Sequence, residues 1–280
     1  MLGRAHSLER SNERLGERRR NRRRRGLIAL FILLLLLLTA AIYGLQQNSV
    51  RISRVEILGA DSSLASYATN AMQGSYFGIV PRDSIFFFPE DRIRADILAA
   101  HQDIAAISIS RSGFTGLVIK VNYRVPIARW CGDATRFNLE NSDLRLNLVA
   151  SCYIFDSLGF IFSAFATTTE TINNFKLYAP LEGATLEPLR ATIVHAEKLP
   201  SVFDFARQLA SFGSPVTSIS INDGEVDDIL ESGTRVSYVL GNEQNAFTAL
   251  VSARDNFNLA DGSVDYIDLR FDGKVYLKKK

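Results

Sequence analysis

The chain has 280 residues, and its 32 basic and 30 acidic residues leave a net charge of only +2. The basic surplus belongs to residues 1–25, which hold ten Arg and three Glu; removing them leaves 22 basic and 27 acidic residues, a net charge of −5. This acidic remainder argues against nucleic-acid binding by a broad basic surface. Its length suffices for two small domains, each with its own core.

A long apolar run lies close to the N-terminus. Leu27 to Leu45 are nineteen almost entirely apolar residues. As a helix they span roughly 28 Å, about the thickness of the hydrocarbon core of a bilayer. A cleaved signal peptide is the competing interpretation, but its apolar region normally has about 7–15 residues. We therefore predict an uncleaved transmembrane helix over residues 26–47.

Four consecutive arginines predict the orientation of this helix. Arg22, Arg23, Arg24 and Arg25 directly precede the apolar run, whereas few basic residues follow it. Because cytoplasmic flanks of membrane helices are rich in Lys and Arg, we expect the N-terminus in the cytoplasm and the remainder outside it. The arginines also suit contact with anionic lipid headgroups. The polar composition of residues 1–25 predicts a disordered cytoplasmic tail on a single-pass cell-membrane protein.

Residues 50–130 show strand and helix patterns in a regular order. Polar and apolar residues alternate at the start of this region, which is typical of a half-buried strand, and Pro89, Glu90 and Asp91 suit the first turn of a helix. The order strand, helix, helix, strand, strand predicts one domain. Its predicted elements are strand Ser53–Gly59, helix Leu64–Gln73, the packed loop Tyr76–Phe88, helix Pro89–His101, strand Ile104–Ser110, the hairpin turn Arg111–Gly116 and strand Leu117–Val125.

Residues 131–280 predict a β-rich domain with flanking helices, so the fold class of the whole chain is α+β. Short apolar segments around a tight turn indicate a hairpin over Tyr153–Phe162. Further along, helical spacing of apolar residues alternates with strand patterns. The predicted helices are Glu187–Leu199, Ser201–Phe212 and Ala246–Phe257, and the predicted strands are Val216–Ile221, Arg235–Leu240 and Tyr266–Leu277.

The chain has two cysteines, Cys131 and Cys152, which flank the polar segment 132–151. In an oxidising compartment an even pair of cysteines can form a disulfide. We favour this pairing because the polar segment between them has little else to hold it. Two buried thiols are the alternative.

The sequence shows no convincing catalytic or metal-binding pattern. His6, His101 and His195 are scattered, and no histidine lies near the cysteines, so no zinc site is predicted. The acidic stretch Asn222–Asp228 lacks ligands at the positions that a calcium loop requires, so we interpret it as a hairpin turn followed by solvated acids. We expect no enzyme activity, no cofactor and no small-molecule substrate.

Three motifs together resemble the FtsQ/DivIB family of bacterial cell-division proteins. The first matches the end of that family's POTRA domain, the second matches its hairpin of an aromatic residue, Asp, Gly and Phe, and the third matches its last strand. With the basic tail and single span, the resemblance covers nearly the whole chain. The matching residues are Arg124, Pro126, Ala128 and Trp130 in the first motif, Asp156, Gly159 and Phe162 in the second, and the run Tyr266–Tyr276 in the third.

The resemblance implies a β-α-α-β-β POTRA domain over residues 50–130 and an FtsQ-like C-terminal domain over residues 131–280. It also implies a non-enzymatic divisome scaffold at the division septum. Such a scaffold binds FtsB/DivIC-like and FtsL-like single-pass proteins and helps to control septal peptidoglycan synthesis. The family's partner site lies at the edge of the C-terminal sheet, and an exposed edge strand can pair with an incoming strand. The matching candidate residues are Tyr266, Asp268, Arg270, Phe271, Asp272, Gly273, Lys274, Val275 and Tyr276.

Two alternative functions remain open from the sequence. One is a membrane-anchored, extracytoplasmic cell-wall enzyme, which would need a nucleophile with its base or a metal site. The other is a different POTRA-containing component of assembly or secretion, although such domains normally precede a β-barrel of many alternating strands.

Overall fold

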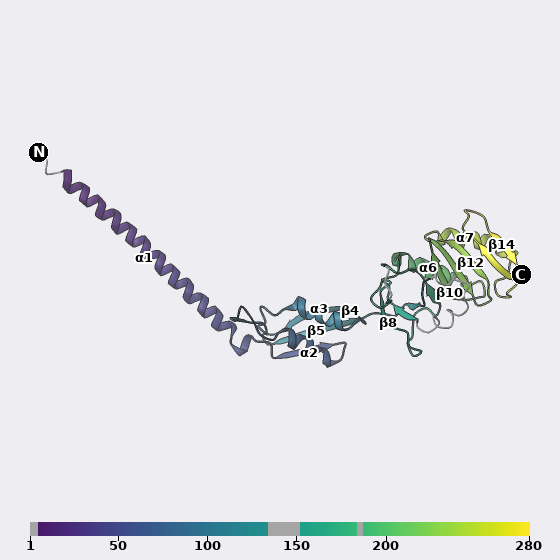
Figure 1. Ribbon diagram of the computed structural model, residues 1–280, viewed down its shortest axis with the longest axis horizontal. Helices are drawn as coiled ribbons and strands as arrows, with labels where there is room; N and C mark the ends of the chain where they lie inside the picture. Colours follow the sequence, from purple (N-terminus) through teal and green to yellow (C-terminus); the bar gives the residue numbers. More distant parts are fainter. Residues whose placement is uncertain (1–4, 134–151, 184–186) are drawn as a thin grey trace. The chain divides into compact units, whose positions relative to one another are not determined.

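The computed structural model describes residues 5–133, 152–183 and 187–280, with the backbone alone for residues 5–21 (Figure 1). The chain is a mixed α+β protein with an apolar N-terminal helix and a β-rich C-terminal region. It divides into two compact units. The first unit comprises Met1–Ala100 with Ala106–Asn122, and the second unit comprises His101–Ala105 with Tyr123–Lys280.

Helix α1 (Ala5–Leu45) contains the apolar run. Its segment Arg22–Leu45 is long and apolar enough to cross a membrane, and its most apolar part is not buried against the rest of the protein. The helix begins at Ala5, which differs from the disordered tail expected over residues 1–25. Arg, Glu and Leu are good helix formers, and extending an existing helix avoids the cost of nucleating a new one.

A three-stranded sheet and the helices α2 and α3 form most of the folded part of the first unit (Figure 1). Strand β1 (Arg54–Leu58) pairs in parallel with β5 (Gly116–Tyr123), and β4 (Ile104–Ser112) lies on the other side of β5. Asp61 caps the short 3₁₀ helix η2 (Ser62–Leu64), which leads into α2 (Ala65–Ala71). Helix α3 (Glu90–Ala100) starts with the two acids predicted for its first turn. The main elements follow one another as strand, helix, helix, strand, strand, with a short strand pair inserted between the two helices.

The core of the first unit comes from the apolar stripes of these elements. Alternate residues of β5 are fully buried, as expected for a strand with one covered face. The predicted packed loop Tyr76–Phe88 differs in detail, because it contains a small antiparallel pair, β2 (Ser75–Tyr76) and β3 (Val80–Pro81). A further 3₁₀ helix, η1 (Asn48–Val50), follows α1. The fully buried apolar residues of this core are Ala68, Ile93, Ile97, Leu117 and Ile119.

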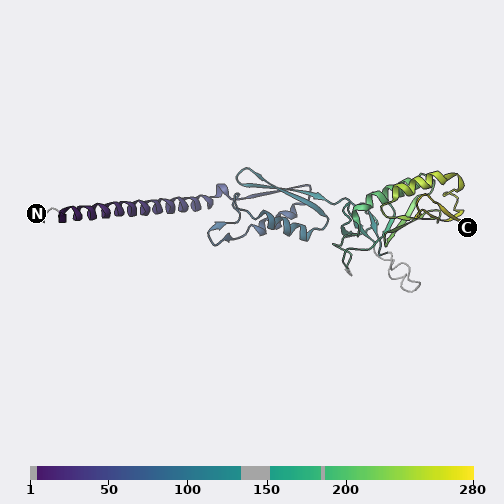
Figure 2. The same cartoon turned by 90° about the horizontal axis from the view of Figure 1, so that it is seen from above.

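The second unit is built on a nine-stranded sheet of order β14-β13-β12-β11-β10-β9-β6-β7-β8. Helices α6 (Leu199–Ala210) and α7 (Glu243–Ala253) lie on one face of its C-terminal half, as Figure 2 shows for the green helices above the strands. The strands are β6 (Ala128–Trp130), β7 (Tyr153–Phe155), β8 (Ile161–Ala164), β9 (Lys176–Tyr178), β10 (Val216–Asn222), β11 (Glu225–Leu230), β12 (Arg235–Val239), β13 (Val264–Asp268) and β14 (Tyr276–Lys279).

Helix α6 supplies the centre of the second core. Its residues Val202, Phe205 and Leu209 recur at helical spacing and are buried against the sheet. The ring of Phe205 lies 4.3 Å from that of Tyr238 on β12 and 6.4 Å from that of Phe247 on α7, between ring centroids. One aromatic side chain thus joins the sheet to both helices.

The predicted helix over Glu187–Leu199 is wrong. This segment forms two isolated antiparallel bridges, Phe160 with Thr192 and Leu181 with Ile193, and only the 3₁₀ helix η3 (Ala196–Lys198) is helical in its described part before Leu199. Its backbone is left-handed at Arg190 and at His195, whose φ angles are 72° and 57°. A left-handed residue cannot continue a right-handed helix. The 3₁₀ helix η4 (Arg254–Asn256) ends the predicted helix over Ala246–Phe257.

Candidate functional site

The two edges of the nine-stranded sheet differ. At one edge, Ile161 of β8 exchanges backbone hydrogen bonds with residues 190 and 191: its N–H donates to Ala191 O at 2.9 Å and its carbonyl accepts from Arg190 N at 2.9 Å. At the other edge, β14 pairs antiparallel with β13, and no other described strand pairs with it. Among the described residues, β14 is therefore the open edge of the sheet.

The predicted partner-binding residues do not form the single strand Tyr266–Leu277 that the sequence suggested. Tyr266 and Asp268 belong to β13, which is an internal strand, and Tyr276 begins β14. The residues between them form a connection that turns at Phe271, where the carbonyl accepts from Lys274 N at 3.0 Å. Gly273 adopts a φ of 66° in this turn. An Asp-Gly pair favours such a turn, which breaks the strand.

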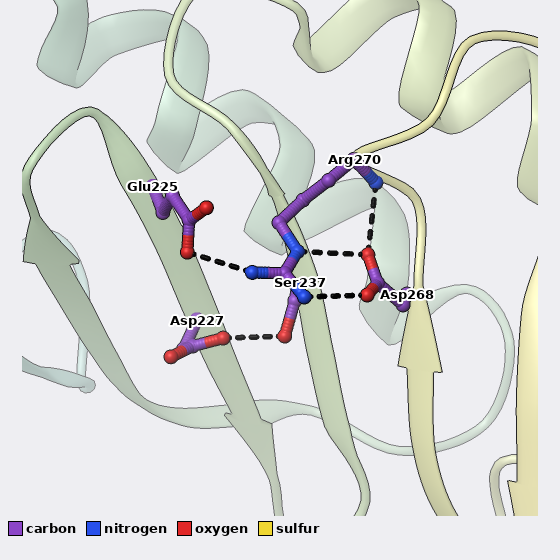
Figure 3. Close-up of polar contacts among 5 residues, drawn as sticks. All are labelled: Glu225, Asp227, Ser237, Asp268 and Arg270. Carbon is purple, nitrogen blue, oxygen red and sulfur yellow. Dashed lines mark hydrogen bonds and ion pairs between the residues drawn. The ribbon is translucent and has the colours of Figure 1, made fainter.

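Arg270 organises the start of this connection on the face of the sheet opposite α6 and α7 (Figure 3). Its Nε and one terminal nitrogen donate to the two carboxylate oxygens of Asp268 at 2.9 and 2.6 Å. Its other terminal nitrogen donates to Glu225 Oε2 on β11 at 2.8 Å. Asp268 also accepts from the Arg270 backbone N at 3.0 Å, and its side chain is only 11% exposed. This forked pairing fixes where the connection leaves the sheet.

The Arg270 guanidinium also controls the charge of Asp268. The hydrogen bonds from Arg270 lower the pKa of the Asp268 carboxyl below its ordinary value, and they raise the pKa of Arg270 in turn. Beside this pair, the Ser237 hydroxyl on β12 donates to Asp227 on β11 (Figure 3). Three neighbouring strands are thus joined by side-chain hydrogen bonds on the face that carries no helix.

Two aromatic rings stand exposed beside the open edge. Phe271 is 53% exposed and Tyr276 is 48% exposed, and their ring centroids lie 5.3 Å apart in an edge-to-face contact. Next to them, a shallow groove of about 610 Å³ runs between α7 and the connection, with Asp272, Gly273 and Val275 along one side. Exposed aromatic pairs next to a groove are typical of protein-binding surfaces.

No protein-family model and no curated protein matches this chain. The candidate site combines an open strand edge, two exposed rings and a groove, and all three lie within residues 245–279.

A buried acid lies in the core of the second unit. Asp228 on β11 is fully buried, its Oδ2 lies 3.5 Å from the Tyr238 hydroxyl, and its Oδ1 has no hydrogen-bond partner. Burial raises the pKa of this carboxyl well above its ordinary value, and the nearby charges of Asp227 and Glu243 act in the same direction. The predicted solvated acidic stretch is therefore wrong at Asp228, which alternates with buried Val226 and Leu230 along β11.

The other two resemblance motifs meet at one cluster in the second unit. Arg124 forms an ion pair with Asp156, donates through Nε to Gln102 O at 3.0 Å, and lies 4.2 Å from the centre of the Phe160 ring. Asp156 also accepts from the backbone N–H of Leu158 and Phe160 in the β7–β8 turn. At Gly159, with φ of 73°, an added Cβ would lie 2.5 Å from Ala196 Cβ. These residues hold the hairpin together.

The cysteines lie in the same half of the second unit. Cys131 and Cys152 are joined by a disulfide, at the ends of β6 and β7. Beside them, the indole N–H of Trp130 donates to Ala179 O at 2.9 Å. His101 and His195 lie near acids, 4.0 Å from Asp103 and 3.6 Å from Glu197. Among the described residues, no group of three His, Cys, Asp or Glu side chains could hold a metal ion.

Proposed function

We propose that this protein is a single-pass membrane scaffold that binds a partner through the open edge strand β14. The observation that carries the proposal is the exposed β14 edge with Phe271 and Tyr276 beside it. An extended segment of a partner would add a tenth strand, and its side chains would contact the two rings. The groove beside α7 offers a second contact for the residues that flank the added strand.

The hydrogen bonds of β14 identify which backbone groups are available. Lys280 N donates to Ser263 O at 2.9 Å, so the backbone of Lys280 faces β13. Because backbone groups alternate along a strand, those of Lys278 and Tyr276 also face β13, and those of Leu277 and Lys279 face outward. An incoming strand would pair with Leu277 and Lys279.

The likeness to the FtsQ/DivIB family extends this proposal to a process. We infer that residues 50–130 are a POTRA domain, supported by the sheet order β1-β5-β4 and two intervening helices. We infer that the partners are FtsB/DivIC-like and FtsL-like single-pass division proteins. The protein would then act at the division septum, outside the cytoplasm, in the control of peptidoglycan synthesis. The length and apolar character of the segment Arg22–Leu45 in α1 support a membrane span.

A proline substitution at Lys279 tests strand addition at the edge. Proline lacks the N–H donor, and an edge strand tolerates it where that N–H faces solvent. The control variant Lys279→Ala removes the same side chain but keeps the N–H. Each full-length protein carries an N-terminal affinity tag and is purified from host membranes, and mass spectrometry identifies the proteins that it retains.

The parent and Lys279→Ala are expected to retain small single-pass proteins with coiled-coil sequences, and Lys279→Pro is expected to lose them. Circular dichroism should show the same folded signal for all three. If Lys279→Pro retains the same partners, the edge is not the binding site. If none of the three retains a single-pass coiled-coil protein, the proposed division scaffold is wrong.

A further inference from the structure

The first unit carries large apolar side chains that nothing in the described structure covers. Phe77 is fully exposed and Phe114 is 70% exposed, and Phe86, Phe87 and Ile79 are each about half exposed. Single exposed apolar residues are ordinary, but five in three loops of one small unit are not. They lie in the β2–β3 turn, in the segment between β3 and α3, and in the β4–β5 turn.

Backbone hydrogen bonds connect these loops to the chain that follows α1. Ile52 N donates to Asp83 O at 2.7 Å, and Ile85 N donates to Val50 O at 2.9 Å. Arg51 makes an ion pair of 2.6 Å with Asp83. The segment with Phe86 and Phe87 is therefore attached directly to residues 50–52.

The other two loops are attached at the same place. Thr115, next to Phe114 in the β4–β5 turn, accepts from Ser53 N at 2.9 Å and from Arg54 N at 3.2 Å. The β2–β3 hairpin, whose turn carries Phe77 and Ile79, ends at Pro81, two residues before Asp83. All three loops thus converge on residues 50–54.

Chain length places residues 50–54 close to the membrane. The segment that could span it ends at Leu45. Val50 follows Leu45 by five positions, and even a fully extended chain would cover at most about 18 Å over that length. The real separation is shorter, because Gln47 N bonds Gly44 O, Val50 N bonds Gln47 O, and Arg51 N bonds Asn48 O in successive turns.

We infer that the exposed side chains of Phe77, Ile79, Phe86, Phe87 and Phe114 contact the outer headgroup region of the bilayer. The inference rests on the proposed membrane span. Segments that lie on a membrane surface bury Phe, Trp and Leu side chains at the boundary between headgroups and acyl chains. Two arginines lie over rings in the same loops: Arg82 is 5.2 Å from the Tyr76 ring centre, and Arg111 is 5.5 Å from that of Phe88. Such cations suit lipid phosphates.

The backbone of the β2–β3 turn supports this role. Phe77 adopts a φ of 52°, in the left-handed region that bulky residues rarely occupy. The ring at this strained position is fully exposed to solvent, so burial of the ring within the protein does not offset the strain. Contact with a bilayer would bury that ring.

Fluorescence quenching by brominated lipids tests the contact. The full-length chain is reconstituted into vesicles with or without bromine on the upper acyl carbons. The parent contains one Trp, the buried Trp130 of the second unit, and gives the baseline signal. Variants Phe77→Trp and Phe87→Trp add an indole to the loops. The matched control is Leu58→Trp, at the far end of β1 and about half exposed in the same unit.

The inference predicts quenching of the added indole and a blue shift of its emission in Phe77→Trp and Phe87→Trp but not in Leu58→Trp. Equal quenching of all three, or of none, overturns it. Alkaline extraction of the same vesicles separates this failure from that of the proposed function. If the protein stays in the vesicles and no added indole is quenched, the span holds and the contact is wrong. If the extraction removes the protein, the membrane span itself is wrong.

Discussion

At the scale of single residues, two acids of the second unit differ in their surroundings: Asp268 has a cationic partner, and Asp228 has none among the described residues. Asp268 accepts three hydrogen bonds from Arg270 on the helix-free face of the sheet. Asp228 lies in the core, and one of its oxygens has no partner. The two carboxyls therefore have pKa values shifted in opposite directions, lowered at Asp268 and raised at Asp228.

Replacing Arg270 should weaken the second unit by a modest amount. Because the folded-state pKa of Asp268 is lowered, its stabilisation is present above the ordinary pKa of about 3.9 and is lost as the pH falls through the lower folded-state value. Arg270 is partly exposed, so screening limits the expected loss in Arg270→Gln to about 1 kcal/mol at pH 7. Urea unfolding followed by circular dichroism measures it.

The Arg270→Gln difference should shrink in strong acid, where Asp268 is protonated in both proteins. Arg254→Gln is the control, since its ion pair with Asp255 is largely exposed. If the two variants lose the same free energy of unfolding, the forked pairing with Asp268 stabilises the fold no more than an exposed ion pair does.

The buried acid gives a pH dependence of the opposite sign. The pKa of Asp228 is raised in the folded state. Above about pH 3.9 the folded protein therefore keeps the proton on this carboxyl, while the unfolded chain loses it. As a result, the free energy of unfolding falls as the pH rises. Asp228→Asn keeps the shape without the charge. We expect this variant to gain stability relative to the parent at pH 8, and to gain less at pH 5.

Thermal unfolding at the two pH values provides the measurement for Asp228→Asn. Asp255→Asn, at an exposed position, should show no such difference between pH 5 and pH 8. If Asp228→Asn is less stable than the parent by the same free energy at both pH values, the Asp228 carboxylate is ionised in the folded core.

At the scale of elements, α6 connects the sheet to α7 through Phe205. This ring is buried and contacts both Tyr238 and Phe247. Phe205→Ala should lower the free energy of unfolding of the second unit by about 3–5 kcal/mol, because it leaves a cavity in the core. The exposed ring at Phe271 is the control, and Phe271→Ala should change stability by no more than about 0.5 kcal/mol. Fluorescence of Trp130 during urea unfolding measures the stability of both variants. If both lose a similar free energy of unfolding, Phe205 is not at the centre of the core.

The elements that were predictable from the sequence are those with uninterrupted patterns. The stripe Val202, Phe205 and Leu209 identified α6, and alternation identified β5 and β10. Strand β11 was missed because its three acids resemble a solvated stretch. The alternation of Val226, Asp228 and Leu230 was the available signal, but one member of the buried set is charged.

The candidate site was only partly predictable. The resemblance predicted that the run Tyr266–Tyr276 binds a partner, and in the structure this run extends from the internal strand β13 to the start of the edge strand β14. Its division into an internal strand, a turn and an edge strand was not predicted, although Asp272-Gly273 is a turn signal. The pairing of Arg270 with Glu225 could not be foreseen, because it joins residues 45 positions apart.

At the scale of the whole molecule, charge is separated between the two ends of the segment that we propose spans the membrane. The ten Arg of residues 1–25 precede it, and the acidic remainder follows it. Orientation should therefore depend on Arg22–Arg25. An alkaline phosphatase fused to the C-terminus, which is active only outside the cytoplasm, should be active on the parent chain.

Replacing all four of these residues with Gln should lower the phosphatase activity per molecule, because the positive flank is weakened. Replacing them with Lys keeps the charge and should leave the activity at the parent level. An inactive fusion on the parent chain would place the C-terminal units in the cytoplasm.

The last residues of the sheet also affect how the protein behaves toward copies of itself. Lys278 is neutralised by Asp265, but Lys279 brings a further positive charge to the open edge. Two molecules meeting edge to edge would oppose their Lys279 ammonium groups, so self-pairing into dimers or fibres is disfavoured. An acidic strand from another protein meets no such repulsion. Salt at 1 M shortens the Debye length, the range over which charges interact, to about 3 Å. Concentrated salt would therefore remove this protection against aggregation.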